Sequence, residues 1–250
     1  MSPRPRQSLA FHADAYALIA SFHRPAIVQV EALAATSLPQ IGGHAHADLK
    51  EFSLPRLVRF DAAYSHVSGS MEDDETATTQ AITSIEGLNI MDVVTADRIV
   101  SRLTSSHNIK EEEGHIIALG STFDNFRVGG YRFDFVLRHE VLMKAKTHEA
   151  LVKAVTSDRK QGKIAAHLHG ATICSLVEEI KTDFPGLSDE DKKKHIVQIP
   201  NFGTLSFAEV FSACGTKTLT MLRFDLGSPD GGGGSAGGTS TNGRPSPPVG

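Results

Sequence analysis

Hydrophobic and polar residues alternate along most of the chain with the two-residue repeat that is typical of β-strands. The clearest stretch is residues 76–137, where β-branched and aromatic residues are interrupted by glycines and acidic turns. The same alternation recurs in shorter segments, at residues 26–36, 57–67, 171–180, 195–200, 204–211 and 218–226. The pattern predicts an all-β fold, mainly antiparallel, built as a sandwich or a flattened barrel of about ten strands.

Two segments carry a helical signal. Within residues 91–105 the apolar residues follow a helical spacing, but Val, Thr and Ile dominate the composition and strand-like segments lie on both sides. We therefore predict a strand for residues 91–105. In residues 147–156, Leu151 and Val155 share one helical face and Thr147 is a suitable N-cap. The sequence thus predicts a small helical insertion near residues 145–160.

The two ends of the chain differ in composition from its centre. Residues 227–250 are nearly all Gly, Ser, Thr and Pro. They offer little apolar surface to offset the entropy of ordering, so we predict a disordered tail. Residues 1–25 are predicted to be a loosely ordered lead or a short helix, because the apolar stretch at 15–22 is short and lacks a signal-peptide cleavage site. Residues 26–226 would then form a single β-rich domain.

Charge and composition argue against several classes of protein. The chain has 25 basic and 29 acidic residues and a net charge of −4, without the clustered basic face of a nucleic-acid-binding protein. No apolar run approaches the ~20 residues of a membrane span. The two cysteines, Cys174 and Cys214, are too few for a disulfide framework. We therefore predict a cytoplasmic protein in which Cys174 is a small core residue.

The histidines are the most suggestive chemical feature. Twelve are present, and four of them form two His-x-His pairs, His44/His46 and His167/His169, with Asp48 extending the first pair. Side chains two residues apart in a strand project from one face ~7 Å apart, so two imidazoles can share one metal ion. If the two pairs converge, they form a divalent-metal site that can activate water for hydrolysis. The simpler alternative is that these are surface histidines in loops beside Gly and Ala.

Two stretches, SIEGLNIMDVVTADRIV at 84–100 and LTMLRFDLGSP at 219–229, resemble the signature stretches of a group of uncharacterised bacterial proteins. The similarity extends from about residue 40 to residue 229 and includes IPNFGTLSFAE at 199–209. It implies a shared framework but no activity, ligand or catalytic residue. The spacing of strands and glycines around residues 85–135 also resembles that of bacterial surface domains, and this second resemblance bears on the fold only.

These observations favour a non-catalytic β-rich binding or structural protein, with a protein or a small molecule as its partner. The nucleophile-elbow, phosphate-loop and dinucleotide-binding motifs are missing from the sequence, so no catalytic or cofactor-binding residue is assigned. The first alternative is a metal-dependent hydrolase that uses His44, His46, Asp48, His167 and His169. The second is a carrier of a small apolar ligand, which needs a closed barrel with an apolar lumen. A structural protein should instead expose an apolar patch or self-associate as a homo-oligomer.

Overall fold

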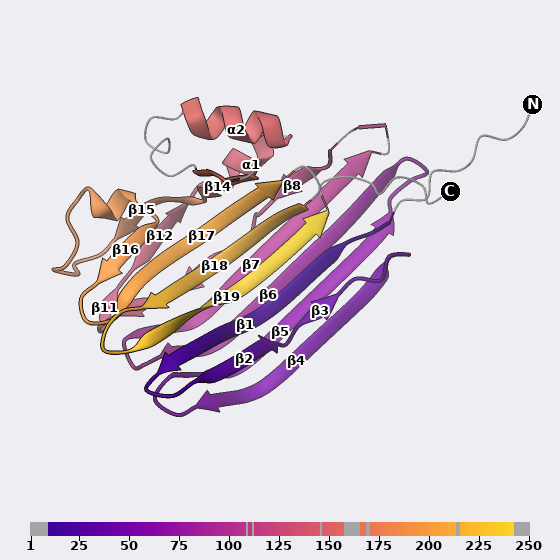
Figure 1. Cartoon of the computed structure of the whole chain (residues 1–250). Coiled ribbons are helices and arrows are strands. Elements are labelled where there is room, and N and C mark those ends of the chain that lie inside the picture. The colour runs from indigo at the N-terminus through magenta and orange to yellow at the C-terminus, as the bar shows by residue number, and fades with distance from the viewer. Residues whose placement is uncertain are drawn as a thin grey trace, which may run out of the picture.

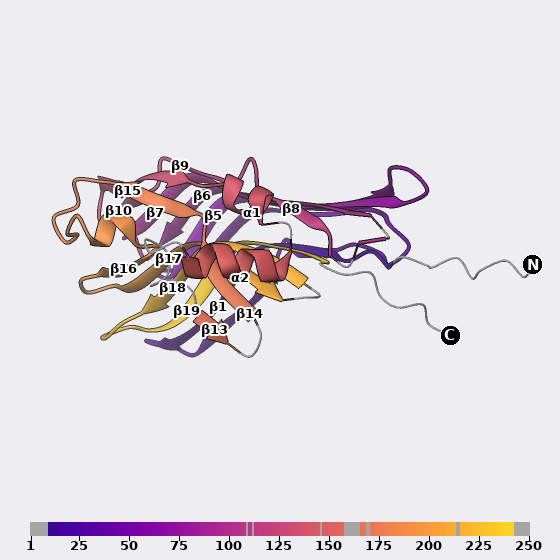
Figure 2. The same cartoon turned by 90° about the horizontal axis from the view of Figure 1, so that it is seen from above.

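The computed structural model describes residues 10–108, 110–111, 113–145, 147–157, 166–168, 171–213 and 216–242. Two antiparallel β-sheets pack face to face, and two short helices lie at one margin (Figures 1 and 2). The predicted all-β, mainly antiparallel fold is confirmed. Of the two predicted architectures it is the sandwich, because the sheets do not close into a barrel. The described residues form nineteen strands rather than about ten, since several expected strands are broken into shorter ones.

The first sheet has nine strands and contains both ends of the described chain. They are β1 (Ala13–Arg24), β2 (Val28–Leu33), β3 (Thr36–Ser37), β13 (Ala166–Leu168), β14 (Ala171–Ser175), β16 (Ile196–Ile199), β17 (Gly203–Ala213), β18 (Thr216–Leu226) and β19 (Gly231–Asn242). The order is β13-β14-β17-β18-β19-β1-β2, with β16 also beside β17 and β3 beside β1. The first and last strands of the sequence therefore lie side by side in the interior of the sheet.

The second sheet has eight strands. They are β4 (Gly43–Leu54), β5 (Val58–Met71), β6 (Thr76–Ile90), β7 (Val94–Asn108), β8 (His115–Ile117), β9 (Thr122–Asp124), β10 (Arg127–Val128) and β11 (Tyr131–Arg132). The order is β11-β10-β7-β6-β5-β4, with β8 and β9 also beside β7. β7 confirms the prediction of a strand within residues 91–105. Two further strands, β12 (Asp134–Leu137) and β15 (Val177–Lys181), form a separate small sheet.

One helix lies within the segment where the sequence predicts a helical insertion, and a shorter one lies just before it. They are α1 (Glu140–Lys144) and α2 (His148–Ser157), and a short 3₁₀ turn, η1, spans Asp191–Lys193. Thr147 caps α2, because its Oγ1 accepts a hydrogen bond of 3.1 Å from the backbone N–H of Ala150. Leu151 and Val155 form the buried face of α2. α1 packs against β8 and α2 against β14.

Most of the core lies between the two sheets. Its largest fully buried side chains include Phe22, Phe126, Phe133, Phe207 and Phe224. Near the start of β1 the interior side chains are smaller, and hydroxyls bond across the sandwich, with Ser101 Oγ 2.8 Å from Thr239 Oγ1. Cys174 is fully buried, and burial raises the pKa of its thiol to about 12. The prediction of a core cysteine is therefore confirmed, while Cys214 lies outside the described residues.

The structure corrects the predicted C-terminal tail. Residues 231–242, expected to be disordered, form β19, which pairs in register with β1 on one side and β18 on the other. Composition gives the wrong prediction here because it reflects the side chains of a segment and not the hydrogen bonds that its backbone can form. β19 gains hydrogen bonds along both edges, and side chains of neighbouring strands pack against several of its glycines. Residues 243–250 lie outside the described residues.

The predicted N-terminal boundary is also wrong. Residues 13–24, expected to be a loose lead or a short helix, form β1, in which buried and more exposed residues largely alternate. Ala13, Leu18 and Phe22 are fully buried, so β1 contributes directly to the core. The β-rich domain therefore extends over the described residues from 10 to 242 rather than from 26 to 226.

Candidate functional site

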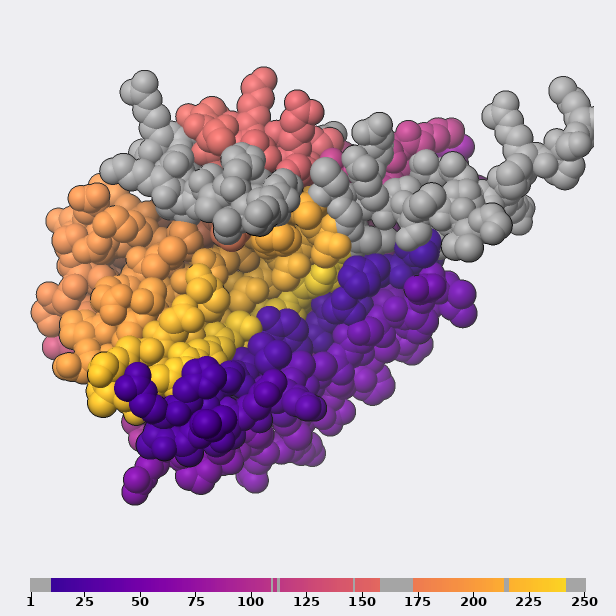
Figure 3. Space-filling view, in the orientation of Figure 1, coloured from indigo at the N-terminus to yellow at the C-terminus, as the bar shows by residue number. Residues whose placement is uncertain are grey.

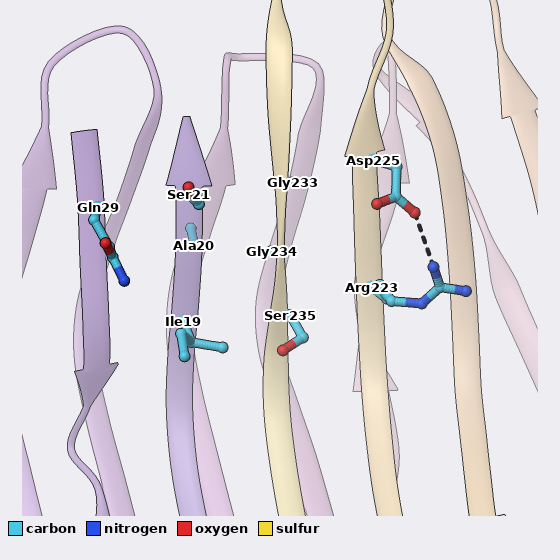
Figure 4. Close-up of a pocket in the computed structure, with 9 residues that line it drawn as sticks. All are labelled: Ile19, Ala20, Ser21, Gln29, Arg223, Asp225, Gly233, Gly234 and Ser235. Carbon is cyan, nitrogen blue, oxygen red and sulfur yellow. Dashed lines mark hydrogen bonds and ion pairs between the residues drawn. The ribbon is translucent and has the colours of Figure 1, made fainter. Parts of the chain in front are cut away.

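An open groove crosses the outer face of the nine-stranded sheet, over the glycine-rich strand β19 (Figure 4). Its volume is about 290 Å³. Four neighbouring strands line it, through Ile19, Ala20 and Ser21 of β1, Gln29 of β2, Arg223 and Asp225 of β18, and Gly233, Gly234 and Ser235 of β19. Glycine within a strand often marks the close approach of another group, so this groove is the candidate binding site.

Two rows of residues cross the floor of the groove. In one row, Ser235 lies between Ile19 and Arg223, and in the next, Gly233 lies between Ser21 and Asp225. A Cβ on Gly233 would lie 2.7 Å from the carbonyl oxygen of Phe224. Close strand spacing therefore explains the glycine at this position.

Gly238, another glycine of β19 that faces outward, is covered by an aromatic ring. Gly238 pairs with Tyr16 of β1, and a Cβ on Gly238 would collide with the Tyr16 ring. The ring therefore lies directly against the glycine, an arrangement known to stabilise glycine in sheets. The Tyr16 hydroxyl forms a hydrogen bond of 2.9 Å with Ser235 Oγ. In the row of Gly233, β1 provides only the small Ser21, and the nearest side-chain atom is Oδ1 of Asp225, 3.0 Å from where a Cβ of Gly233 would lie, so no ring covers the floor.

Replacing Gly238 with alanine should displace the Tyr16 ring. We expect the free energy of unfolding to fall by about 2 kcal/mol, because ring packing and the hydroxyl hydrogen bond are lost together. Urea denaturation measures this change. Tyr16→Phe is the matched control, since it removes only the hydroxyl and should cost about 1 kcal/mol. A Gly238→Ala protein as stable as the unmodified chain would contradict the position of the ring.

An ion-pair network fixes the polar wall of the groove. Arg223 donates from Nε to Glu209 Oε2 at 2.8 Å and from Nη2 to Glu209 Oε1 at 3.0 Å. Its Nη1 donates to Asp225 Oδ2 at 2.9 Å, the contact drawn in Figure 4. Nη2 also donates to Ser206 Oγ at 3.1 Å. The planar guanidinium is thus held by two carboxylates and a hydroxyl, which leaves it little rotational freedom.

A buried histidine completes this network. His195 is 3% exposed, and its Nε2 lies 3.6 Å from Glu209 Oε1. Its Nδ1 is buried and has no hydrogen-bond partner among the described residues. Burial alone would raise the pKa of Glu209, but the contacts with His195 and Arg223 outweigh it and lower that pKa to about 2. Glu209 is therefore a firmly ionised anchor for Arg223 and a poor proton acceptor at neutral pH.

An irregularity shared by β17 and β18 explains why Glu209 reaches the outer face. Phe207 pairs with Leu222 and Glu209 with Thr220, so the register is unchanged, but Ala208 and Met221 between them form no ladder pair. Ala208 has a φ of +46°, in the left-handed region. The alternation of buried and outward residues reverses here on both strands, so the core positions of β17 change from odd to even numbers and Glu209 turns outward. At the same point the neighbour of β17 changes from β14 to β16.

The structure separates the residues of the predicted metal site. His44, His46 and Asp48 are exposed on one face of β4, as the two-residue repeat predicts. β4 is the edge strand of the eight-stranded sheet, whereas His167 lies in β13, at the far edge of the other sheet. His169 lies outside the described residues. Within the part of the chain that the structure describes, no three His, Cys, Asp or Glu side chains could hold a metal ion together.

Comparison with known proteins gives a family but no activity. A family model described as a domain of unknown function (DUF8256) matches residues 9–165, more than half of the chain. The match includes β1 and the stretch 84–100, but not β17, β18 or β19. No curated protein and no solved structure matches the chain. Among the described residues, none of the helices has the length and apolar character needed to cross a membrane.

Proposed function

We propose that this chain, which belongs to the family of the domain of unknown function (DUF8256), is a non-catalytic β-rich binding protein. Its groove over β19 would hold a tyrosine side chain of a partner polypeptide. The observation that carries the proposal is the packing of Tyr16 on Gly238. The Tyr16 ring lies against the glycine, and its hydroxyl forms a hydrogen bond with Ser235. The floor at Gly233, which no ring of this chain covers, offers a glycine surface beside the Asp225 carboxylate in a neighbouring part of the same strand.

The groove has complementary walls for such a ring. Ile19, which is 42% exposed, provides an apolar wall on the β1 side. On the β18 side, Arg223 and Asp225 are already fixed in a hydrogen-bonded pair, so little side-chain entropy is lost when they contact a ligand. A guanidinium favours contact with aromatic rings, and a carboxylate accepts a hydrogen bond from a phenolic hydroxyl.

The shape of the groove favours a polypeptide partner over a free small molecule. Sites for small molecules usually bury most of the ligand, whereas this groove is open along the face of a sheet. A tyrosine presented by a larger partner can gain its remaining contacts outside the groove. Two features support a non-catalytic role. Glu209 is tied to Arg223 and His195, and burial raises the pKa of the Cys174 thiol to about 12.

The probe for this proposal is N-acetyl-tyrosinamide, followed by amide chemical shifts in NMR. We expect binding with a Kd of about 1 mM or weaker, because only one side chain is engaged. The largest shifts should fall on Ser21, Gly233 and Ser235. Ser21→Tyr should abolish these shifts, since it places a ring of the chain itself over Gly233, as Tyr16 covers Gly238.

The matched control is Ile27→Tyr, which adds the same side chain at a residue that is 87% exposed and outside the groove. This variant should bind the probe as the unmodified chain does. N-acetyl-leucinamide should produce much smaller shifts, because it lacks the planar ring and hydroxyl. Equal shifts with both probes, or shifts that persist in Ser21→Tyr, would overturn the proposed site.

A further inference from the structure

Strand β4 leaves one side of the eight-stranded sheet open. It has 12 residues, whereas the strands at the other sheet edges, β2, β11 and β13, have 6, 2 and 3. β4 lies outermost in Figure 1, and the violet segment that includes it forms the lower margin of the molecule in Figure 3. An edge strand presents unpaired N–H and C=O groups that can pair with another strand.

The features that usually block an edge are confined to one end of β4. Lys50 is exposed, Glu51 has a φ of +50° and forms no ladder pair with β5, and Pro55 follows the strand. Residues 43–49 contain no lysine, no proline and no break in register with β5. This half of the edge is therefore regular and unprotected.

The inner face of the same segment is incompletely covered. Ala45, Ala47 and Leu49 point toward the core but remain partly exposed. Residues on the inner face of the adjacent strand are buried, with Ala63 at 4% and Val67 at 0% exposure. A strand added beside β4 would complete the burial of these apolar side chains.

The outer face of this segment is complementary to itself. It carries His44, His46 and Asp48. Asp48 has no ion pair with another described residue, and its register partner within the sheet is Tyr64. In an antiparallel pair of two β4 strands centred on residue 46, Asp48 of each copy faces His44 of the other. Centring on residue 47 instead places it opposite His46.

We infer that β4 pairs with β4 of a second copy of this chain, joining the two eight-stranded sheets across a two-fold axis. Such an interface is isologous, so each favourable Asp–His contact occurs twice. The self-complementary charge pattern is what favours a second copy over an unrelated strand. The GHAHAD segment then serves as an oligomerisation edge, on a different sheet from the groove over β19.

The test is the mass of the full chain in solution, measured by size-exclusion chromatography with light scattering at several concentrations. We expect a dimer of twice 26.8 kDa. Asp48→Lys should raise the dissociation constant at least about tenfold, because each new lysine faces a histidine across the interface. His44→Glu with Asp48→Lys reverses the pattern in the register centred on residue 46, and His46→Glu with Asp48→Lys reverses it in the register centred on residue 47, so one of these double variants should restore the dimer.

Glu31→Lys is the matched control. It makes the same charge change on β2, the edge strand of the other sheet, and should leave the dimer intact. Circular dichroism of each variant reports whether it is folded. A folded chain that stays monomeric at every concentration would overturn the inference. So would a dimer that is insensitive to Asp48→Lys, or one that is lost in Glu31→Lys.

Discussion

A chain that ends at Leu226 should fail to fold. The deletion removes β19, which separates β1 from β18 in the nine-stranded sheet. Its loss leaves two inner strands without a partner along one edge and uncovers fully buried residues, among them Leu18 and Leu222. The stability of a whole domain is only about 5–15 kcal/mol, and the loss of a central strand exceeds it. The measurement is thermal unfolding followed by circular dichroism, which should show no cooperative transition.

The matched control is a chain that ends at Asn242, which keeps all of β19. It should unfold cooperatively and within a few degrees of the full chain. If the chain ending at Leu226 were also to unfold cooperatively at that temperature, β19 would not be a structural part of the sheet. The comparison therefore distinguishes a strand of the sheet from the dispensable tail that the composition of residues 227–250 predicts.

Most strands whose side chains alternate could be predicted from the sequence, with β1 as an exception, whereas β19, which is held by its backbone, could not. β7 is predicted despite a helical spacing, because Val, Thr and Ile dominate its composition. β19 is missed because its sequence, GGGGSAGGTSTN, offers almost no apolar side chains, and its order depends on hydrogen bonds to β1 and β18. The partners of these bonds are distant in sequence, so a local pattern contains no trace of them.

The candidate site was harder to predict than the fold. Histidine pairs are visible as a local motif, but whether two motifs meet depends on strand order, and β4 and β13 belong to opposite edges of different sheets. Glu209 and Arg223 carry no motif at all. One signal was present, since the buried apolar residues of β17 change from odd to even numbers between Phe207 and Val210, as a reversal of the strand alternation requires. That shift indicates an outward Glu209, although it does not name its partners.

Glu209→Gln should lower the free energy of unfolding by about 2 kcal/mol at pH 7. The pKa of Glu209 falls from its ordinary 4.5 to about 2, because contacts with His195 and Arg223 outweigh the effect of burial. A shift of this size corresponds to about 3 kcal/mol, and we reduce it because the Arg223 side chain is 43% exposed and solvent screens the pair. Glutamine keeps the shape of the side chain but not the charge that holds the guanidinium.

The pH dependence of this effect has a defined sign. A carboxyl group whose pKa is lower in the folded chain stabilises the fold fully above its unfolded pKa, here about 4.5, and loses that contribution as the pH falls toward 2. The difference in unfolding free energy between the unmodified chain and Glu209→Gln should therefore be constant near neutrality and shrink below about pH 4.5. Urea denaturation at a series of pH values measures this difference.

Asp191 provides a control, because its pKa is lowered to about the same value as that of Glu209 but its surroundings differ. Hydrogen bonds from Lys194 and Ser188 lower the pKa of Asp191 to about 2, but its carboxyl group is solvent-exposed. Because water screens such a pair, Asp191→Asn should leave the free energy of unfolding nearly unchanged at every pH. If Asp191→Asn and Glu209→Gln shift stability equally, burial is not what makes the Glu209 network strong. If only Glu209→Gln lowers the free energy of unfolding substantially, the partly buried Glu209–Arg223 pair contributes more to stability than the exposed pair of Asp191.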